Sequence, residues 1–186
     1  RDTAAAMALA AAIIARRNPA ATTVVLPSDH HIPNPTAFRS TLAKAVQAAR
    51  AFSQIVTIAI PPTFACTAFG YLELGQPVSD QSPARQLLKF HEKPDAQIAQ
   101  SYIEQGNFRW NAGMFVLKAS VWLKALEQFR PDISQAAQQA WHQRRTDAAF
   151  IRPGNAEFKA IPSESIDYAV MERCPGSYFP IQMVTL

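Results

Sequence analysis

The sequence predicts an α/β protein with a mixed, mostly parallel sheet that is flanked by helices. Segments with apolar residues at helical spacing alternate along the chain with short apolar segments of strand length, as they do in βαβ units. Two of the short segments, residues 22–27 and 54–62, have no polar face, which is typical of strands covered on both sides. The 186 residues are 48% apolar and 17% charged, so they can bury one globular core.

The first third of the chain alternates between helix and strand. Residues 3–17 are predicted as a helix of small residues, with Asp2 or Thr3 as its N-cap and Asn18-Pro19 as its stop. The strand at 22–27 follows. A second helix is expected over residues 35–52, and a second buried strand at 54–62 ends in two prolines.

The remaining chain begins with a long polar stretch, residues 61–86, that is rich in Gly and Pro and reads as a loop. Strands are then expected at 87–94, 108–117 and 178–186. A helix at 95–106 has Asp95 as its cap and Gly106 as its end, and another at 120–133 has Ser120 as its cap and Pro131 as its terminator. A short helix at 163–176 begins at Ser163 or Ser165. No repeat or linker divides the chain, so one domain is expected.

Composition disfavours several classes of protein. The net charge is only +4, and the Lys and Arg residues are scattered, which argues against nucleic-acid binding. The apolar run near the N-terminus is too short to span a membrane, and no basic segment precedes it as in a secretory signal. Cys66 and Cys174 are far apart and match no metal-ligand spacing, which indicates two free thiols in the reducing cytoplasm.

The sequence VVLPSDHHI, residues 24–32, places polar side chains just beyond a predicted strand. Ligands of open α/β sheets bind at the carboxyl ends of the strands, where Asp29 is expected to lie. A carboxylate there can bind Mg²⁺ together with phosphate oxygens, or it can simply cap a turn before Pro33. His30 and His31 are adjacent and would point in opposite directions, so they are not expected to chelate one metal, and at most one of them faces the site.

Three other segments add polar groups near strand ends. Glu92 and Lys93 precede a proline and could form only a solvated surface pair. Asn111 lies inside an apolar strand, where it could bind a ligand or complete a bulge next to Gly113. Gly70 could offer its backbone N–H to a hydroxyl group. An acid, an ammonium and an amide on one rim together describe a sugar-phosphate site, in which Lys pairs with the phosphate.

Several longer segments resemble a known family. They are RDTAAAMALAA, LPSDHHI, TAFGYLELG, FHEKPDAQIAQSYIEQGNFRWNAGMF, FRPDI and ESIDYAVMER, and they follow one another along nearly the whole chain. The sequence resembles the bacterial mannose-1-phosphate guanylyltransferases of the sugar nucleotidyltransferase family. The resemblance implies a Rossmann-like nucleotidyltransferase core and an enzyme that forms GDP-mannose and pyrophosphate from GTP and mannose 1-phosphate, with Mg²⁺ as cofactor.

The resemblance also implies roles for individual residues in sugar-phosphate and metal binding. Asp29 matches the family's first Mg²⁺ aspartate, and Lys93 is expected to hold the sugar phosphate, so these two are the predicted catalytic residues. Glu92 and Asn111 are expected to bind sugar hydroxyl groups, and Gly70 to contact the sugar through its backbone. These assignments predict the sugar side of the site.

Other matching positions concern the nucleotide. Arg1, Asp2 and Thr3 fall where the family forms part of its base pocket. Asp167 is counted among the substrate-binding residues by analogy, without an assigned role. The partners implied are GTP and mannose 1-phosphate, with no nucleic acid and no membrane, and self-association into a homo-oligomer is left open.

The chain also departs from the family pattern. Ala68 replaces a usual glycine near Gly70, and Ala5 replaces a usual proline. The family's Gly-rich phosphate loop and its second metal aspartate have no counterpart in residues 1–186, so we expect a nucleotidyltransferase domain that is incomplete at both ends and does not transfer GMP alone. Two alternatives stay open, another hexose-1-phosphate nucleotidyltransferase and a non-catalytic regulatory relative that binds sugar phosphate.

Overall fold

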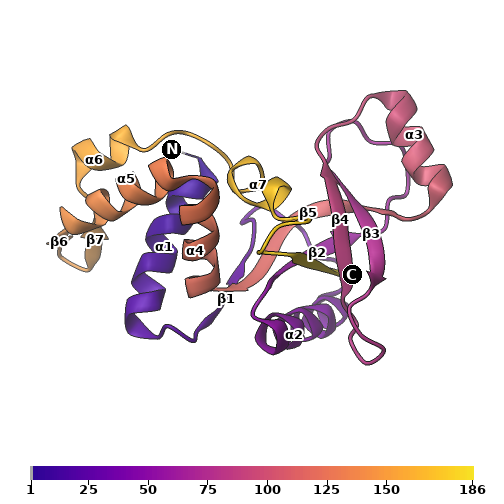
Figure 1. The fold of residues 1–186 in the computed structure, drawn as a ribbon, viewed down its shortest axis with the longest axis horizontal. Coiled ribbons are helices and arrows are strands. Elements are labelled where there is room, and N and C mark those ends of the chain that lie inside the picture. Colours follow the sequence, from indigo (N-terminus) through magenta and orange to yellow (C-terminus); the bar gives the residue numbers. More distant parts are fainter. Residues whose placement is uncertain (1) are drawn as a thin grey trace. The chain divides into compact units, whose positions relative to one another are not determined.

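The computed structural model describes residues 2–186, which form two compact units (Figure 1). The helical unit contains residues 2–21 and 119–173, and the sheet unit contains residues 22–118 and 174–186. Each unit is therefore assembled from two segments that are distant in the sequence. The organisation as a single domain stays a prediction, and the units are described one at a time.

The sheet unit is built on one mixed sheet of six strands in the order β1-β5-β2-β8-β4-β3, in which β3 also pairs with β5. Every pair except one is antiparallel. The strands are β1 (Thr22–Val25), β2 (Ile55–Ile60), β3 (Tyr71–Pro77), β4 (Arg85–His91), β5 (Phe108–Lys118) and β8 (Ile181–Thr185).

The α/β class and the mixed sheet are confirmed, but the expectation of a mostly parallel sheet is wrong. Only β2 and β8 pair in parallel. The strands β1 and β2 run in the same direction, as a βαβ unit predicts, yet the long strand β5 lies between them and pairs antiparallel with both. A short connection also forces β3 and β4 into an antiparallel hairpin. An apolar strand sequence does not reveal such an inserted neighbour.

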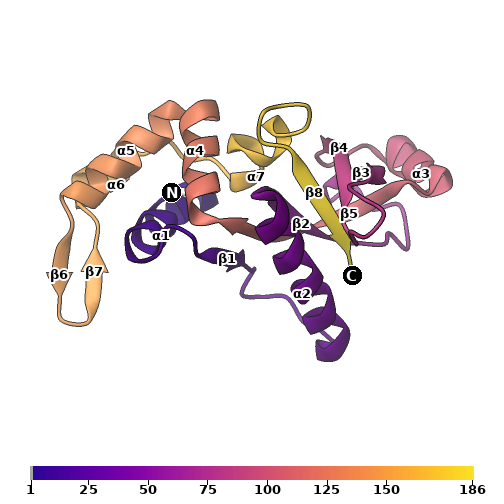
Figure 2. The same ribbon diagram turned by 60° about the horizontal axis from the view of Figure 1, so that its bottom comes forward.

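Two helices pack on the sheet. The helix α2 (Pro35–Phe52) is capped by Asn34 and buries Ala45, Ala48 and Ala49 against β2 and β5. Figure 2 shows α2 next to β2. The helix α3 (Ala96–Gln105) is capped by Asp95 and ends at Gly106, as predicted from the sequence. It packs near a cluster of buried aromatic residues from β3 and β5, namely Tyr71, Phe108 and Trp110.

The helical unit contains α1 (Thr3–Arg17), α4 (Ala119–Phe129) and α5 (Pro131–His142), which surround a core that includes Trp122 and Ile133. Asp2 caps α1 as expected. The remaining elements are short: β6 (Arg145–Asp147), β7 (Phe150–Arg152), α6 (Asn155–Ala160), α7 (Ile166–Ala169) and the 3₁₀-helix η1 (Met171–Arg173). The strands β6 and β7 form a hairpin whose residues are all exposed.

Several local expectations are corrected. The stretch 61–86 contains strand β3, and β1 is a half-exposed edge strand because only β5 pairs with it. Ser120 lies inside α4, which begins at Ala119. Pro131 does more than end a helix, since it is the first residue of α5, where its missing N–H costs nothing.

Two expectations about composition can also be compared with the structure. No helix within residues 2–186 is long and apolar enough to cross a membrane. Cys66 and Cys174 are both free thiols, as predicted. Burial raises the pKa of the Cys174 thiol to about 12, which keeps it protonated and unreactive at neutral pH.

Candidate functional site

A β-bulge interrupts strand β5, and at this bulge one edge of β5 changes its partner from β3 to β1. Ile58 of β2 pairs with Met114 and the next residue, Ala59, pairs with Asn111, so Ala112 and Gly113 are extra residues on β5. Gly113 has φ +63°, a conformation that favours glycine. Its N–H donates to Oδ1 of Asn111 at 3.1 Å. The amide of Asn111 therefore helps to satisfy the bulge, which was the structural alternative considered for this residue.

Two segments approach this bulge along the same edge of β5. The strand β1 pairs with the C-terminal half of β5, and Pro27 just beyond it lies 3.6 Å from where a Cβ atom on Gly113 would be. The strand β3 pairs with the N-terminal end of β5, and the carbonyl of Gly70 just before it accepts the N–H of Asn111 at 2.8 Å. The end of β1 and the start of β3 therefore meet at the bulge.

Gly70 also lies against Glu92. A Cβ atom on Gly70 would be 2.8 Å from Oε2 of Glu92, closer than real Cβ atoms approach, and 3.0 Å from the ring of Phe90, which would be a tight contact. The neighbouring residues Tyr71 and His91 are direct cross-strand partners, which fixes this approach through the register of β3 and β4. The structure thus brings together three of the predicted residues: Gly70 just before β3, Glu92 just after β4, and Asn111 at the bulge inside β5.

Lys93 joins this group through Glu92. Its Nζ lies 3.1 Å from Oε1 of Glu92, and the two side chains are 60% and 20% exposed, so the pair is weak and a ligand can compete for both charges. The backbone of Lys93 is more unusual. It has φ +41° although it is not glycine and precedes a proline, and such a conformation costs about 1–3 kcal/mol. We call Gly70, Glu92, Lys93 and Asn111 the sheet cluster.

Asp29 lies in the loop between β1 and α2, two residues beyond Pro27, and its side chain is exposed. Since Asn34 caps α2, this helix does not require Asp29 as a cap. His30 and His31 are exposed as well. Within residues 2–186 no three His, Cys, Asp or Glu side chains gather as metal ligands. One exposed carboxylate fits a Mg²⁺ ion whose remaining ligands are water and phosphate oxygens, which is how Mg²⁺ commonly binds.

The other predicted residues belong to the helical unit, and Arg1 lies outside the described residues. Oδ1 of Asp2 accepts the N–H of Thr3 at 2.7 Å. Oγ1 of Thr3 accepts the N–H of Ile166 at 2.8 Å, which joins the start of α1 to the start of α7 next to Asp167. We call Asp2, Thr3 and Asp167 the helix cluster. The sequence does not predict the hydrogen bond between Thr3 and Ile166, because the two residues are 163 positions apart.

A group of side chains that was not predicted from the sequence lies next to the turn that carries Glu92 and Lys93. The hydroxyl of Tyr102 lies 2.9 Å from Nδ1 of His91, and Nε2 of His91 lies 3.5 Å from Oε2 of Glu73. The ring of Tyr102 stacks on Phe108 with the centroids 4.0 Å apart. Burial, and then the charges of Glu73 and Asp95, raise the pKa of Tyr102, so its O–H stays protonated. His91, Tyr102 and Phe108 lie inside the family-like segment 90–115, but their mutual contact depends on how β4, α3 and β5 pack, which the sequence does not indicate.

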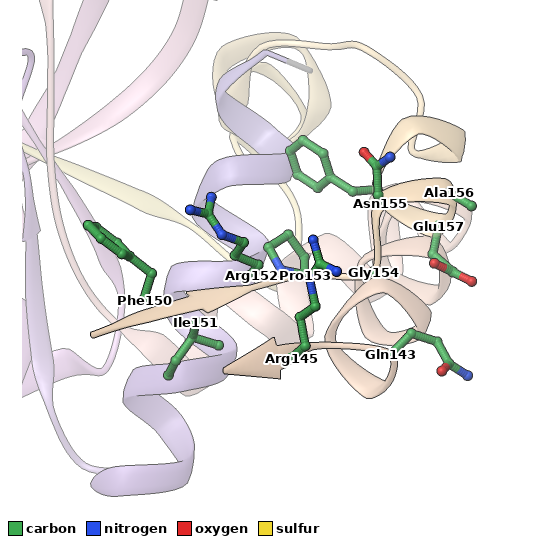
Figure 3. Close-up of a pocket in the computed structure, with 11 residues that line it drawn as sticks. Gln143, Arg145, Phe150, Ile151, Arg152, Pro153, Gly154, Asn155, Ala156 and Glu157 are labelled. Carbon is green, nitrogen blue, oxygen red and sulfur yellow. The ribbon is translucent and has the colours of Figure 1, made fainter. Parts of the chain in front are cut away.

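A cavity of about 870 Å³ in the helical unit contains none of the predicted residues (Figure 3). It lies between the β6–β7 hairpin and α6, and its charged lining residues are Arg145, Arg152 and Glu157. Arg152 is already paired with Asp147. Glu157 supplies a carboxylate to the same hollow, so the cavity is a weaker candidate for an anion site than the sheet cluster.

The chain is similar to several known proteins. A family model described as "Nucleotidyl transferase" matches residues 1–160. The xanthan biosynthesis protein XanB of Xanthomonas campestris is 40% identical over 173 residues, which are 93% of this chain and 36% of that protein. The mannose-1-phosphate guanylyltransferase ManC of Salmonella typhimurium is 41% identical over 177 residues, which are 93% of this chain and 37% of that protein.

Among solved structures, the mannose-6-phosphate isomerase from Helicobacter pylori superposes with a TM-score of 0.84 at 29% identity, over 100% of this chain and 69% of that one. The chain spans little more than a third of the length of the two curated relatives. The family model covers most of the chain. The chain therefore belongs to the nucleotidyl transferase family.

Proposed function

We propose that this chain provides the sugar-phosphate side of a mannose-1-phosphate guanylyltransferase, which forms GDP-mannose and pyrophosphate from GTP and mannose 1-phosphate. The observation that carries the proposal is the sheet cluster, in which the backbone of Gly70 lies against the carboxylate of Glu92 beside Lys93 and Asn111. The 41% identity to a Salmonella protein with that name supports the choice of substrate.

In this proposal each group of the sheet cluster binds one part of the sugar phosphate. The ammonium of Lys93 pairs with the phosphate as a point charge, and the carboxylate of Glu92 accepts hydrogen bonds from sugar hydroxyl groups. The amide of Asn111 and the backbone of Gly70 contact further hydroxyl groups. Gly70 is required because any side chain there would displace Glu92.

The proposed reaction is a direct displacement. An oxygen of the sugar phosphate forms a bond to the α-phosphorus of GTP, the bond from that phosphorus to the β-phosphate oxygen breaks, and pyrophosphate leaves with the electron pair. Bound Mg²⁺ would neutralise the charge on the phosphates, and Asp29 is its proposed ligand in this chain. Lys93 keeps the attacking phosphate in position, which accounts for much of the catalysis in such reactions.

The helix cluster is the proposed nucleotide side. Asp2 and Thr3, with Arg1, are proposed to contribute to the base pocket, and Asp167 to lie near the substrates. We propose the cytoplasm as the compartment, since both cysteines are free.

Calorimetric titration of residues 1–186 with mannose 1-phosphate tests the sugar side. Glu92→Gln and Lys93→Ala should each weaken binding about 10- to 100-fold, because the first removes the charge of an acceptor and the second removes the charged donor to the phosphate. Glu104→Gln and Lys44→Ala are matched controls at exposed positions and should leave binding unchanged. Equal binding by wild type and both site variants would contradict the proposed role of the sheet cluster.

Turnover is measured in the full-length protein. Asp29→Asn should reduce GDP-mannose synthesis by at least about 100-fold without changing the fold, since it removes one charge from the metal site. Near-normal turnover would exclude Asp29 as a metal ligand. Preferential use of glucose 1-phosphate would favour a related nucleotidyltransferase, and binding without turnover by the full-length protein would favour a regulatory relative.

A further inference from the structure

The turn that carries Glu92 and Lys93 is held in an unfavourable backbone conformation. Lys93 has φ +41° and is followed by Pro94, and both features disfavour the observed geometry for a lysine. A residue keeps such a conformation only where the structure around it fixes both ends of the turn. The groups that fix these ends therefore decide where the Lys93 ammonium lies.

Each end of this turn is attached to a regular element. On one side, His91 is the last residue of β4 and pairs with Tyr71 of β3. On the other side, Oδ1 of Asp95 accepts the N–H of Ile98 at 2.8 Å and so fixes the first turn of α3. These two attachments do not by themselves hold β4 and α3 together, so a further contact between the two elements is needed.

A side-chain contact connects the two elements. The hydroxyl of Tyr102 on α3 lies 2.9 Å from Nδ1 of His91 on β4, which closes a loop that contains both Glu92 and Lys93. Nε2 of the same imidazole faces Glu73 at 3.5 Å. The contact between the Tyr102 hydroxyl and Nδ1 is thus the hydrogen bond that joins this imidazole to α3, while Nε2 lies near the Glu73 carboxylate without a hydrogen bond to it.

Packing restricts the alternatives for both rings. Tyr102 stacks on Phe108 of β5 with ring centroids 4.0 Å apart, and His91 contacts the same Phe108 with centroids 5.6 Å apart. Both rings are partly buried. The hydroxyl of Tyr102 is thus aimed at His91 by a stacked ring and cannot swing away without losing that stacking.

We propose that Tyr102 and His91 are positioning residues for sugar-phosphate binding, which act by holding the Glu92–Lys93 turn between β4 and α3. The ligand class, a hexose 1-phosphate, rests on the proposed function. Neither residue touches the ligand in this proposal. Removal of the hydrogen bond should let Lys93 relax from its positive φ, so that the lysine and Glu92 are no longer fixed in front of the phosphate.

The first measurement requires no ligand. In Tyr102→Phe, which keeps the stacked ring, the backbone order parameter of Lys93 from ¹⁵N relaxation should fall from about 0.85 to about 0.6. Tyr178→Phe is the matched control, because it removes a tyrosine hydroxyl from a side chain that is 85% exposed. An order parameter of Lys93 that is equal in all three proteins would overturn the proposal.

The second measurement is the dissociation constant for mannose 1-phosphate. We expect about a tenfold increase in Tyr102→Phe and in His91→Phe, and no further increase when the two are combined, because both remove the same contact. His91→Asn keeps an acceptor for the tyrosine and should recover part of the affinity. Additive losses in the double variant would contradict a shared positioning role.

In the full-length protein, the KM for mannose 1-phosphate should rise in Tyr102→Phe while the KM for GTP stays constant. A general loss of folding would change both. If wild type binds no hexose 1-phosphate while Lys93 still loses order in Tyr102→Phe, the proposed function is wrong and the positioning of the turn is retained. If wild type binds mannose 1-phosphate and Lys93 stays ordered in Tyr102→Phe, the proposed function is retained and only the positioning role is wrong.

Discussion

The sheet cluster and the helix cluster are assembled in different ways. In the sheet cluster, Gly70 precedes β3, Glu92 follows β4 and Asn111 lies within β5, so strand register fixes each backbone, and the N–H of Asn111 donates directly to the carbonyl of Gly70. In the helix cluster, the starts of α1 and α7 are joined by one side-chain hydrogen bond from Ile166 to Thr3 and one backbone bond from Ala4 to Glu164.

This difference has a consequence for stability. Sheet hydrogen bonds form a ladder, so the neighbouring hydrogen bonds still hold the strands together when one contact is lost. The helix cluster depends on two local contacts and on the packing of α1 with α4 and α5 beneath them. We therefore expect the helix cluster to open locally more readily than the sheet cluster, and three substitutions can test this expectation.

The largest effect is expected from Trp122→Ala. Trp122 is fully buried in α4, and its truncation should lower the free energy of unfolding by about 3–5 kcal/mol, which chemical denaturation measures. Hydrogen exchange then separates the two clusters. The amide of Ile166 should exchange faster, and the amide of Asn111, bonded to Gly70, should keep more of its protection. Equal loss of protection at both amides would refute the difference.

A smaller effect is expected from Gly70→Ala. The added methyl group would meet Oε2 of Glu92 at 2.8 Å, and this flexible side chain can move away at little cost to folding. Binding of mannose 1-phosphate should weaken by at least about tenfold, which is about 1.4 kcal/mol, while the free energy of unfolding changes by less. Gly106→Ala is a poor control because of its positive φ. Ala68→Gly, in the same loop, is a better one.

The smallest effect is expected from Thr3→Val. This change keeps the shape of the side chain but leaves the N–H of Ile166 without its acceptor, so the unfolding free energy should fall by about 1 kcal/mol. Thr3→Ser restores the hydroxyl and should recover most of this loss in the same denaturation experiment. A valine variant as stable as wild type would mean that the helix cluster does not depend on this bond.

The sequence predicted best the elements whose ends are set locally. Asp2 caps α1, Asp95 caps α3 and Gly106 ends α3, and each of these signals is read from the residue itself. Strand β3 was missed because it contains Gly75 and Pro77 and gains its stability by pairing with β4 and β5. Strand direction was misjudged because β5, far along the chain, lies between β1 and β2.

Part of the candidate site could also be predicted from the sequence. The family resemblance pointed to Gly70, Glu92, Lys93 and Asn111, and the structure places these residues together. The contact between Tyr102 and His91 was not predictable, since it depends on how α3 packs on the hairpin. The positive φ of Lys93 was equally hidden, because a lysine before a proline normally indicates an extended backbone.

The β6–β7 hairpin has two outer edges that are open to a further strand. In the described part of the chain, each of its strands pairs only with the other, so both outer edges offer backbone groups to a further strand. Phe150 beside them is 64% exposed, which would favour association. Arg145 and Arg152 are direct cross-strand partners, however, and a second copy of the ribbon would bring its own arginines against them. Asp147 already pairs with Arg152, so the charge repulsion that opposes edge-to-edge aggregation at this exposed ribbon comes mainly from Arg145.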